Sequence, residues 1–344
     1  MDLVENALNN NYGSEDFFKA NIAVCGVGGG GSNTVQRLSR LGVKGAALIA
    51  FNTDSKHLNT LDSGIRRSLL GGPLTRGLGA GGFPEMGTKA AEYSRTDIET
   101  ALKDINLLFL CAGMGGGTGT GAAPVIADVA KKNGSIVLGI VTFPFALERV
   151  RINVAKKGIE ELSKNCDTLI VIDNQRLVQL YPNLAIDQAF KVADEVAARA
   201  VRGITETINT PSLINLDYAD VKNILNKGGL AMISIGEGHG SNKIEEAVEN
   251  TLRNKLLDVD YEQAANMLIH ITGGEDMTLG EANEIGSRLT ESISPSANVV
   301  WGARIDQSYA GKVEVIAIIT GVKSPEITGT GTREAKENFG LGEI

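Results

Sequence analysis

Residues 113–121, GMGGGTGTG, lie between the apolar run 106–112 and the helix-forming run 122–132. Six of these nine residues are glycine, and each glycine costs roughly 0.5–1 kcal/mol of extra backbone ordering relative to alanine. A loop that accepts this loss needs its glycines for their positions, because glycine permits positive φ and a close approach to a ligand. The hydroxyls of Thr118 and Thr120, together with the free N–H groups of the following helix, predict that this ligand is a phosphate.

The glycine loop contains no lysine, unlike a GxxxxGK[ST] phosphate loop. We therefore expect the anion to be held by amide dipoles, hydroxyls and a metal ion. A flexible linker is the alternative interpretation. Linkers, however, carry serine, asparagine and charge, whereas the flanks LLFLCAG and AAPVIADVA are apolar.

The composition is that of a globular protein. The 344 residues suffice for two domains, and 42% of them are hydrophobic. No apolar run approaches the roughly 18 residues of a membrane span, and the first residues are acidic and polar, so we expect a cytoplasmic protein without membrane insertion. A net charge of −8 without a basic cluster argues against nucleic acid as the main partner.

The cysteines and histidines do not suggest a metal site or a disulfide framework. The cysteines are odd in number and lie in or near apolar segments, so we expect reduced core residues: Cys25, Cys111 and Cys166. The histidines show no metal-ligand spacing, and we expect them on the surface or satisfied in the core: His57, His239 and His270.

Short strands rich in valine and isoleucine alternate with helices in the first half, which predicts a doubly wound, mostly parallel α/β sheet of the Rossmann type. The expected strands are 22–27, 46–52, 107–112, 136–141 and 168–173, and the expected helices are 33–41, 87–100, 122–132 and 153–163. A long amphipathic helix, 186–202, should follow, with Gly203 as its stop. Beyond it we expect a smaller α+β domain with a four-stranded sheet, containing strands 231–236, 266–272, 299–305 and 313–320 and helices 219–225 and 243–255.

Two further glycine clusters follow strands in the same half. Residues 26–31 match GxGxxG, and Asp54 follows the next strand, a pattern that taken alone suggests an NAD-dependent oxidoreductase. Any nucleotide whose phosphates lie at a helix N-terminus needs the same close approach of the backbone. The match is therefore weak, and the oxidoreductase remains an open alternative. With the cluster at 77–82, three loops predict one phosphate pocket.

An acidic motif, NLDYAD, begins at Asn215 and places Asp217 and Asp220 near one face of a helix start. One interpretation is structural, since Asp217 suits an N-cap and Asp220 the helix dipole. The other is catalytic. An anionic pair has little reason to sit beside its own molecule's phosphates, so it would serve better on a neighbouring molecule.

These residues resemble the FtsZ family of tubulin-like cell-division GTPases over nearly the whole chain, 21–323. The resemblance rests on four segments in the family's order and spacing: GGGTGTG from Gly115, RGLGAGGFPEMG from Arg76, NLDYADV from Asn215 and GGLAMISIGEG from Gly228. It implies an N-terminal extension (1–20), a GTP-binding domain (21–185), a connecting helix (186–203), a polymerisation domain (204–323) and a tail (324–344).

The resemblance also implies roles for individual residues. Glu148 and Arg151 would contact ribose and phosphate, Asn174 and Phe190 would line the base, and Asp194 would read guanine. Mg²⁺ would be held mainly through phosphate and water, with no dedicated protein ligands. The other nucleotide-binding residues would be Asp54, Gly113 and those of the three phosphate loops: Gly28, Gly29, Gly30, Gly31, Ser32, Asn33, Gly79, Ala80, Gly81, Gly82, Gly115, Gly116, Gly117, Thr118, Gly119, Thr120 and Gly121.

The function implied is a GTPase that assembles head to tail into protofilaments of a mid-cell division ring, each subunit supplying Asn215, Asp217 and Asp220 to its neighbour's GTP. A related filament for cell shape or regulation is the alternative. The sequence departs from the family in two places. The loop around Glu148, ALERVRIN, is one residue short and lacks a glycine. The end, NFGLGEI, lacks the bacterial partner-binding peptide, which leaves the membrane anchor and division partners unidentified and points to an archaeal type.

Overall fold

One continuous ten-stranded sheet runs through the residues that the computed structural model describes, namely 20–324 without 181, 184, 210–217, 227, 254–258, 260–263 and 292. Its order is β3-β2-β1-β4-β5-β6-β7-β10-β8-β9. The first half contains β1 (Ile22–Val27), β2 (Ala46–Asn52), β3 (Arg66–Leu69), β4 (Leu107–Gly113), β5 (Ile136–Phe143) and β6 (Thr168–Asp173). The second contains β7 (Gly229–His239), β8 (Asn266–Gly273), β9 (Asn298–Ile305) and β10 (Lys312–Thr320).

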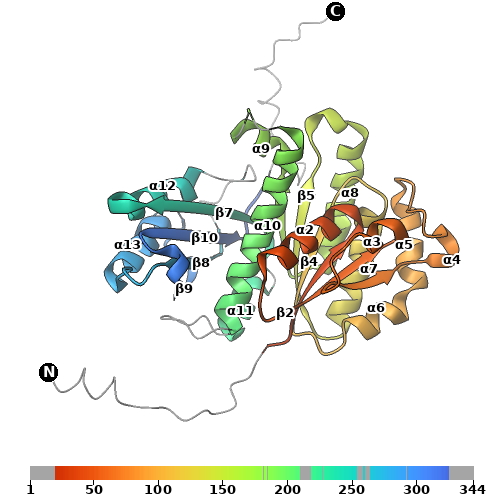
Figure 1. The fold of residues 1–344 in the computed structure, drawn as a ribbon, viewed down its shortest axis with the longest axis horizontal. Coiled ribbons are helices and arrows are strands. Elements are labelled where there is room, and N and C mark those ends of the chain that lie inside the picture. The colour runs from red at the N-terminus through yellow and green to blue at the C-terminus, as the bar shows by residue number, and fades with distance from the viewer. Residues whose placement is uncertain are drawn as a thin grey trace, which may run out of the picture.

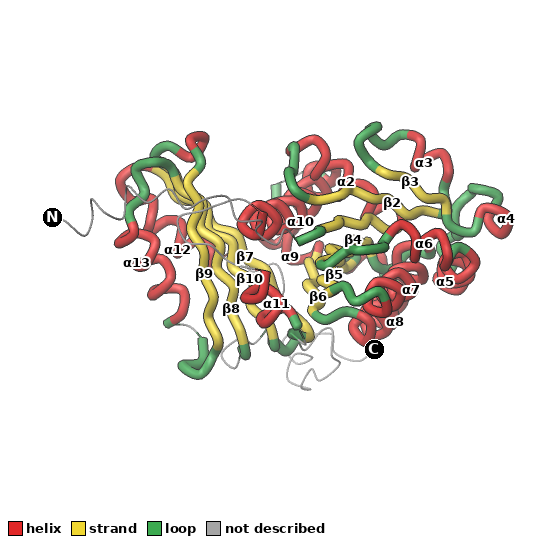
Figure 2. The backbone as a smooth tube through the Cα atoms, turned by 90° about the horizontal axis from the view of Figure 1, so that it is seen from below, coloured by secondary structure: helices red, strands yellow, loops and turns green. Residues whose placement is uncertain are grey.

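The first half is the doubly wound parallel sheet that the sequence predicts. β1, β2, β4, β5 and β6 pair in parallel, and β1 and β6 are buried along their full length, which explains their continuous apolar character. Its helices are α2 (Gly28–Leu41), α3 (Ser55–Asn59), α4 (Gly72–Thr75), α5 (Pro84–Tyr93), α6 (Arg95–Ala101), α7 (Thr118–Lys132), α8 (Val150–Asn165), α9 (Asn174–Leu180) and α10 (Ile186–Asn209). Figure 2 shows α2 and α10 on one face of the sheet and α5 to α8 on the other.

The second half is a smaller mixed sheet, as predicted. β10 pairs antiparallel with β7 and β8, and β8 pairs in parallel with β9. Its helices are α11 (Tyr218–Leu225), α12 (Lys243–Arg253) and α13 (Leu279–Thr290). Among the described residues, the two halves share the sheet through three residue pairs between β6 and β7, which begin at Thr168 opposite Gly229. Figure 1 shows α10 running between the halves.

Helix α10 does not end at Gly203, so that prediction was wrong; the helix continues to Asn209. Gly203 serves packing, because a Cβ there would lie 2.8 Å from Cδ1 of Ile316 and 3.0 Å from Cδ2 of His270. The His270 ring is buried, contacts the hydroxyl of Thr272 at 3.0 Å, and has its pKa lowered by burial to about 3. This confirms a satisfied core role for His270.

Ion pairs connect α10 to both halves. Arg199 pairs with Glu237 on β7 and with the buried carboxylate of Glu314 on β10. One turn earlier on the same face of the helix, Glu195 pairs with Arg199 and accepts a hydrogen bond from Arg37 of α2. Burial raises the pKa of Glu314, while Arg199 opposes that shift.

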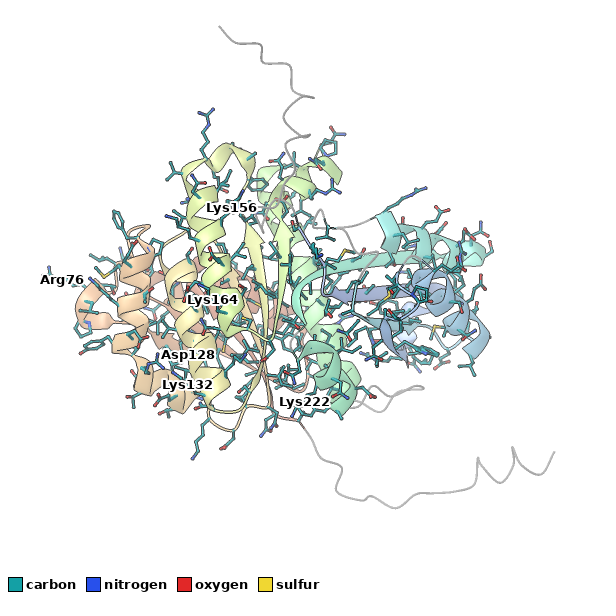
Figure 3. The ribbon with its side chains drawn as sticks, turned by 180° about the vertical axis from the view of Figure 1, so that it is seen from behind. Arg76, Asp128, Lys132, Lys156, Lys164 and Lys222 are labelled. Carbon is teal, nitrogen blue, oxygen red and sulfur yellow. The ribbon has the colours of Figure 1, made fainter. Side chains whose placement is uncertain are left out.

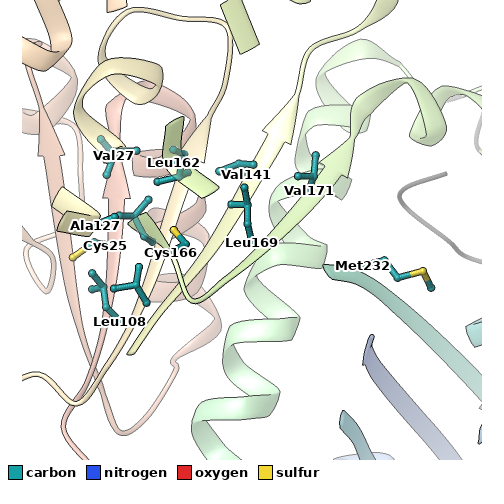
Figure 4. Close-up of a cluster of buried hydrophobic side chains, with 14 of the residues drawn as sticks. Cys25, Val27, Leu108, Ala127, Val141, Leu162, Cys166, Leu169, Val171 and Met232 are labelled. Atoms are coloured by element: carbon teal, nitrogen blue, oxygen red, sulfur yellow. The ribbon is translucent and has the colours of Figure 1, made fainter. Parts of the chain in front are cut away.

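The three cysteines are free and buried, as expected. Figure 4 shows Cys25 and Cys166 among apolar side chains such as Leu108 and Leu169. Burial raises the pKa of the Cys166 thiol to about 12, so the group stays protonated at neutral pH.

Candidate nucleotide-binding site

A cavity of about 910 Å³ lies at the carboxyl ends of β1, β4, β5 and β6, where open α/β sheets bind their ligands. Twelve predicted site residues line it: Gly29, Gly30, Asn33, Gly113, Gly116, Gly117, Thr118, Gly119, Glu148, Arg151, Asn174 and Asp194. The structure therefore brings residues from five separated segments into one site. Ten further lining residues were not predicted: Gln36, Arg37, Arg40, His57, Thr60, Leu61, Met114, Thr142, Pro144 and Lys191.

The glycine loops that follow β1 and β4 pack directly against each other. A Cβ on Gly31 would lie 2.1 Å from the carbonyl oxygen of Cys111, and a Cβ on Gly28, whose φ is +70°, would lie 2.8 Å from the amide nitrogen of Gly119. Gly29 and Gly116, by contrast, have nothing within 4 Å of an added Cβ. Gly28 and Gly31 are thus required for the close packing of the two loops. Gly29 and Gly116 line the cavity without such a packing constraint.

The remaining predicted residues of the glycine loops do not line the cavity. Several of them are buried and hold the loops in place through hydrogen bonds and packing. Thr120 Oγ1 accepts a hydrogen bond from the Gly115 amide at 2.9 Å, and Ser32 is fully buried. A Cβ on Gly121 would lie 1.9 Å from the carbonyl oxygen of Pro84, so α5 and α7 touch here.

The third glycine cluster lies beside the cavity. Gly79, Ala80 and Gly81 border a separate depression of about 450 Å³, and the Ala80 side chain packs against Gly117. Asp54 caps α3 by accepting a hydrogen bond from the backbone N–H of His57. The cluster packs against the main loop, with Gly82 and Phe83 in contact with Gly117, but the described lining of the cavity comes from only two of the three predicted glycine clusters.

The predicted base-binding end contains one paired and one unpaired polar group. Asp194 Oδ1 accepts a hydrogen bond from Thr34 Oγ1 at 3.0 Å, and burial raises the pKa of this carboxyl to about 6. Asn174 is 5% exposed, and its Oδ1 has no hydrogen-bond partner among the described residues. A buried acceptor without a partner costs free energy, so a ligand with N–H donors would stabilise it. The side chain of Phe190 lies outside the described residues.

Glu148 and Arg151 are paired with each other at the cavity rim. Arg151 Nη1 donates to Glu148 Oε2 at 2.8 Å, and Glu148 Oε1 accepts from the Phe145 amide at 3.0 Å. The shortened loop therefore retains both predicted side chains at the cavity. Arg151 is 63% exposed and can turn toward a ligand.

Basic side chains contribute more to the cavity than we predicted. Arg37, Arg40 and Lys191 line it in addition to Arg151. Among the described side chains, these four cations outnumber the two lining carboxylates, which suits an anionic ligand. Arg37 and Arg40 lie three residues apart on α2, which follows the first glycine loop. This spacing places both on one face of the helix, so the sequence could have indicated them as cavity residues.

The predicted catalytic acids are distributed differently. Asn215 and Asp217 lie outside the described residues. Asp220 lies in the first turn of α11, whose Tyr218 hydroxyl donates to the carbonyl oxygen of Asn106, just before β4 begins. This is the amino end of the parallel strands, opposite the cavity. In Figure 3, Lys222 of α11 lies at the bottom of the parallel sheet, and Lys156 lies toward the top, on the same helix as the cavity residue Arg151.

Within the described ranges, no group of three or more histidine, cysteine, aspartate or glutamate side chains could hold a metal ion. The same ranges contain no helix long and apolar enough to cross a membrane.

Comparisons with known proteins match both halves of the fold. Residues 21–182 match the family model described as "Tubulin/FtsZ family, GTPase domain". Residues 229–323 match that described as "FtsZ family, C-terminal domain". Neither match supports the alternative of an NAD-dependent oxidoreductase.

Individual relatives agree along nearly the full length. The chain is 53% identical to Cell division protein FtsZ 2 of Methanocaldococcus jannaschii (97% of this chain, 89% of the relative) and 48% identical to Cell division protein FtsZ 2 of Halobacterium salinarum (97% and 87%). A solved structure, "FtsZ dimer, empty" from M. jannaschii, is 44% identical with a TM-score of 0.85 (93% of this chain, 91% of that chain). The chain therefore belongs to the tubulin/FtsZ family and is a GTPase of the FtsZ type.

Proposed function

We propose that the cavity binds GTP with the guanine at Asp194 and Asn174 and the phosphates on the two packed glycine loops. The Asp194 carboxylate can accept from guanine N1–H and the 2-amino group, whereas adenine offers an acceptor at N1, so adenine would pair poorly. The unpartnered Asn174 Oδ1 supports this orientation, since it requires a donor. Gly29, Gly116 and Thr118 would face the phosphates.

We propose that hydrolysis occurs between copies joined head to tail, with Asn215, Asp217 and Asp220 of one copy acting on the GTP of the next. The observation that carries this is the position of Asp220, at the opposite end of the parallel strands from the cavity. A contact of this kind is heterologous and continues as a filament. The acids would orient and polarise the attacking water.

Exposed apolar side chains beside the glycine loops support a surface for a second copy. Leu78 is 76% exposed and Phe83 is 67% exposed, and both lie in the segment that touches Gly117. Adjacent exposed apolar residues favour protein contact. The M. jannaschii relative whose structure is titled a dimer agrees with self-association.

Mg²⁺ bound with GTP would stabilise negative charge on the phosphate oxygens. Because the described residues offer no ligand cluster, the ion would be held through phosphate oxygens and water, with Thr118 as a neutral oxygen near the loop. The chain's own contribution is to fix the phosphates.

In the cell, we propose a cytoplasmic filament of the mid-cell division ring, in line with the names of the relatives. A filament for cell shape is the second candidate, distinguished by localisation in dividing cells. The domain boundaries after residues 20, 185 and 323 remain a proposal. The connecting helix ends at Asn209 and not at residue 203.

Mixing two inactive variants tests the shared site. Asp220→Ala keeps its cavity and should bind GTP normally but hydrolyse it about 10²–10⁴ times more slowly. Asp194→Ala should lose GTP binding but keep Asp220. In a mixture, the Asp194→Ala subunit completes the cavity of its neighbour, so GTPase activity should exceed the sum of the separate variants. Activity no greater than that sum, or loss of GTP binding by Asp220→Ala, would refute the proposal.

A further inference from the structure

Three side chains form a hydrogen-bonded chain that ends at the cavity. Asn52 Nδ2 lies 3.1 Å from His57 Nδ1, and His57 Nε2 lies 3.2 Å from Asn33 Oδ1. Asn52 is buried at the end of β2, His57 lies on α3, and Asn33 lies on α2, with Asn33 and His57 lining the cavity. The chain thus connects a buried amide to the ligand-facing surface.

A backbone amide fixes the direction of every bond in this chain. The Asp54 N–H can only donate, and it lies 3.3 Å from Asn52 Oδ1. The Asn52 amide is therefore oriented with its Nδ2 toward His57, and this nitrogen can only donate. His57 Nδ1 must then be an unprotonated acceptor, so the neutral imidazole carries its proton on Nε2.

The same logic determines the Asn33 amide. The Nε2–H of His57 donates to Asn33 Oδ1, so the Asn33 NH₂ group is left for the cavity. Among the described residues, none accepts a hydrogen bond from this Nδ2. A reversed amide would place two donors together at His57 and present an acceptor to the anionic ligand.

We propose that His57 is a positioning residue for nucleotide binding: its Nε2–H tautomer holds the Asn33 carboxamide with both N–H donors toward an oxygen of the bound nucleotide. This rests on the proposed binding of GTP in the cavity. It assigns His57 a role through Asn33, beyond the satisfied or surface role expected from sequence. The backbone N–H of His57 donates to Asp54 Oδ1, which fixes the start of α3 and with it the place from which the ring reaches Asn33.

A double-mutant cycle tests this coupling. The dissociation constant of GDP should rise about 10- to 150-fold in both His57→Ala and Asn33→Ala, the range for one lost hydrogen bond to an anionic ligand. In the double variant, the loss should equal that of Asn33→Ala alone, because His57 acts only through that amide. His57→Gln, whose amide offers an acceptor and a donor side by side, should recover most of the affinity. His239→Ala, which alters an exposed histidine at the end of β7, is the matched control.

Nitrogen NMR of ¹⁵N-histidine protein at pH 8 without nucleotide supplies a second reading. The His57 ring, assigned by the loss of its signals in His57→Gln, should show a protonated Nε2 and an unprotonated Nδ1. Additive losses in the cycle, or the opposite tautomer, would overturn the inference. If the unaltered protein failed to bind GDP, the proposed nucleotide site would fail, whereas the NMR result would still test the hydrogen-bonded chain.

Discussion

Replacing Asp194 by asparagine should stabilise the nucleotide-free protein while it abolishes the preference for guanine. Burial raises the pKa of this carboxyl from 3.8 to about 6 in the folded chain, so at neutral pH the folded state holds a charge that it disfavours. The difference corresponds to about 3 kcal/mol. Because the side chain is partly exposed, solvent reduces this figure, and we expect a gain of about 1–3 kcal/mol. Asparagine can still accept from Thr34.

Urea unfolding without nucleotide measures the effect. The folded pKa lies above the unfolded one, so the ionised Asp194 destabilises the native state above about pH 6, and this cost disappears as the pH falls toward 4. The difference between Asp194→Asn and the unaltered protein should therefore be greatest near pH 7.5 and shrink toward pH 4.5. Asp62→Asn, at a carboxylate 45% exposed, is the control and should change stability by less than about 0.5 kcal/mol.

The reasoning is refuted if Asp194→Asn is less stable than the unaltered protein at pH 7.5, or if the difference between them does not depend on pH. Guanine binding is read separately. The variant should lose about tenfold to a hundredfold in GDP affinity, as expected for about 1–3 kcal/mol of lost pairing with the two donors of guanine. A gain in stability with unchanged GDP affinity would remove Asp194 from the base site.

Three further outcomes follow from the structure. GDP affinity of the unaltered protein should fall about fourfold from pH 7.5 to 5.5, since the bound guanine needs Asp194 ionised; titration calorimetry showing no loss would exclude this role. Gly121→Ala should prevent stable folding because its Cβ would lie 1.9 Å from a backbone oxygen of α5, whereas Gly116→Ala, with nothing within 4 Å, should fold, as circular dichroism would show. Gly203→Ala should lower the free energy of unfolding by about 1–3 kcal/mol, because its Cβ would lie 2.8 Å from a methyl group of β10. Gly286→Ala in α13, where an added Cβ meets nothing within 4 Å, should be neutral or stabilising. Equal effects of the two substitutions in urea unfolding would contradict this account.

The pattern of apolar residues predicted the long strands and helices correctly, because in these elements the apolar positions are also the buried ones. β1 and β6 are buried on both faces, so their apolar runs are unambiguous. β3 was missed because its sequence, RRSL, is short, polar and largely exposed. Helix α13 was also missed, although Thr278 and Glu281 form a capping box that the sequence displays.

Local breaks and long-range packing were harder to predict. The expected helix 87–100 is two helices separated at Ser94, whose hydroxyl accepts from the Gly71 amide, a contact between residues 23 positions apart. Gly203 resembles a helix stop in sequence, but the side chains that require it lie on β8 and β10. Such positions are defined by partners distant in the chain.

At the site, the sequence and the resemblance identified the glycine loops and several side chains that line the cavity, among them Glu148, Asn174 and Asp194, but they missed others. The glycines of the loop after β4 were found because glycine is costly and conspicuous. His57 and Lys191 stand in no recognisable motif. Each lines the cavity only because of where the fold places α3 and α10. The roles of Phe190, Asn215 and Asp217 stay predictions.

The narrow connection between β6 and β7 has a mechanical consequence. Three residue pairs join these strands, whereas nine join β7 to β10 and seven join β4 to β5. Resistance to separation grows with the number of cross-strand hydrogen bonds, so tension applied between the two ends of the molecule would part the sheet at this connection before any of the wider ladders. The ion pairs of Arg199 and the packing of α10 against β8 and β10 would then hold the two halves together.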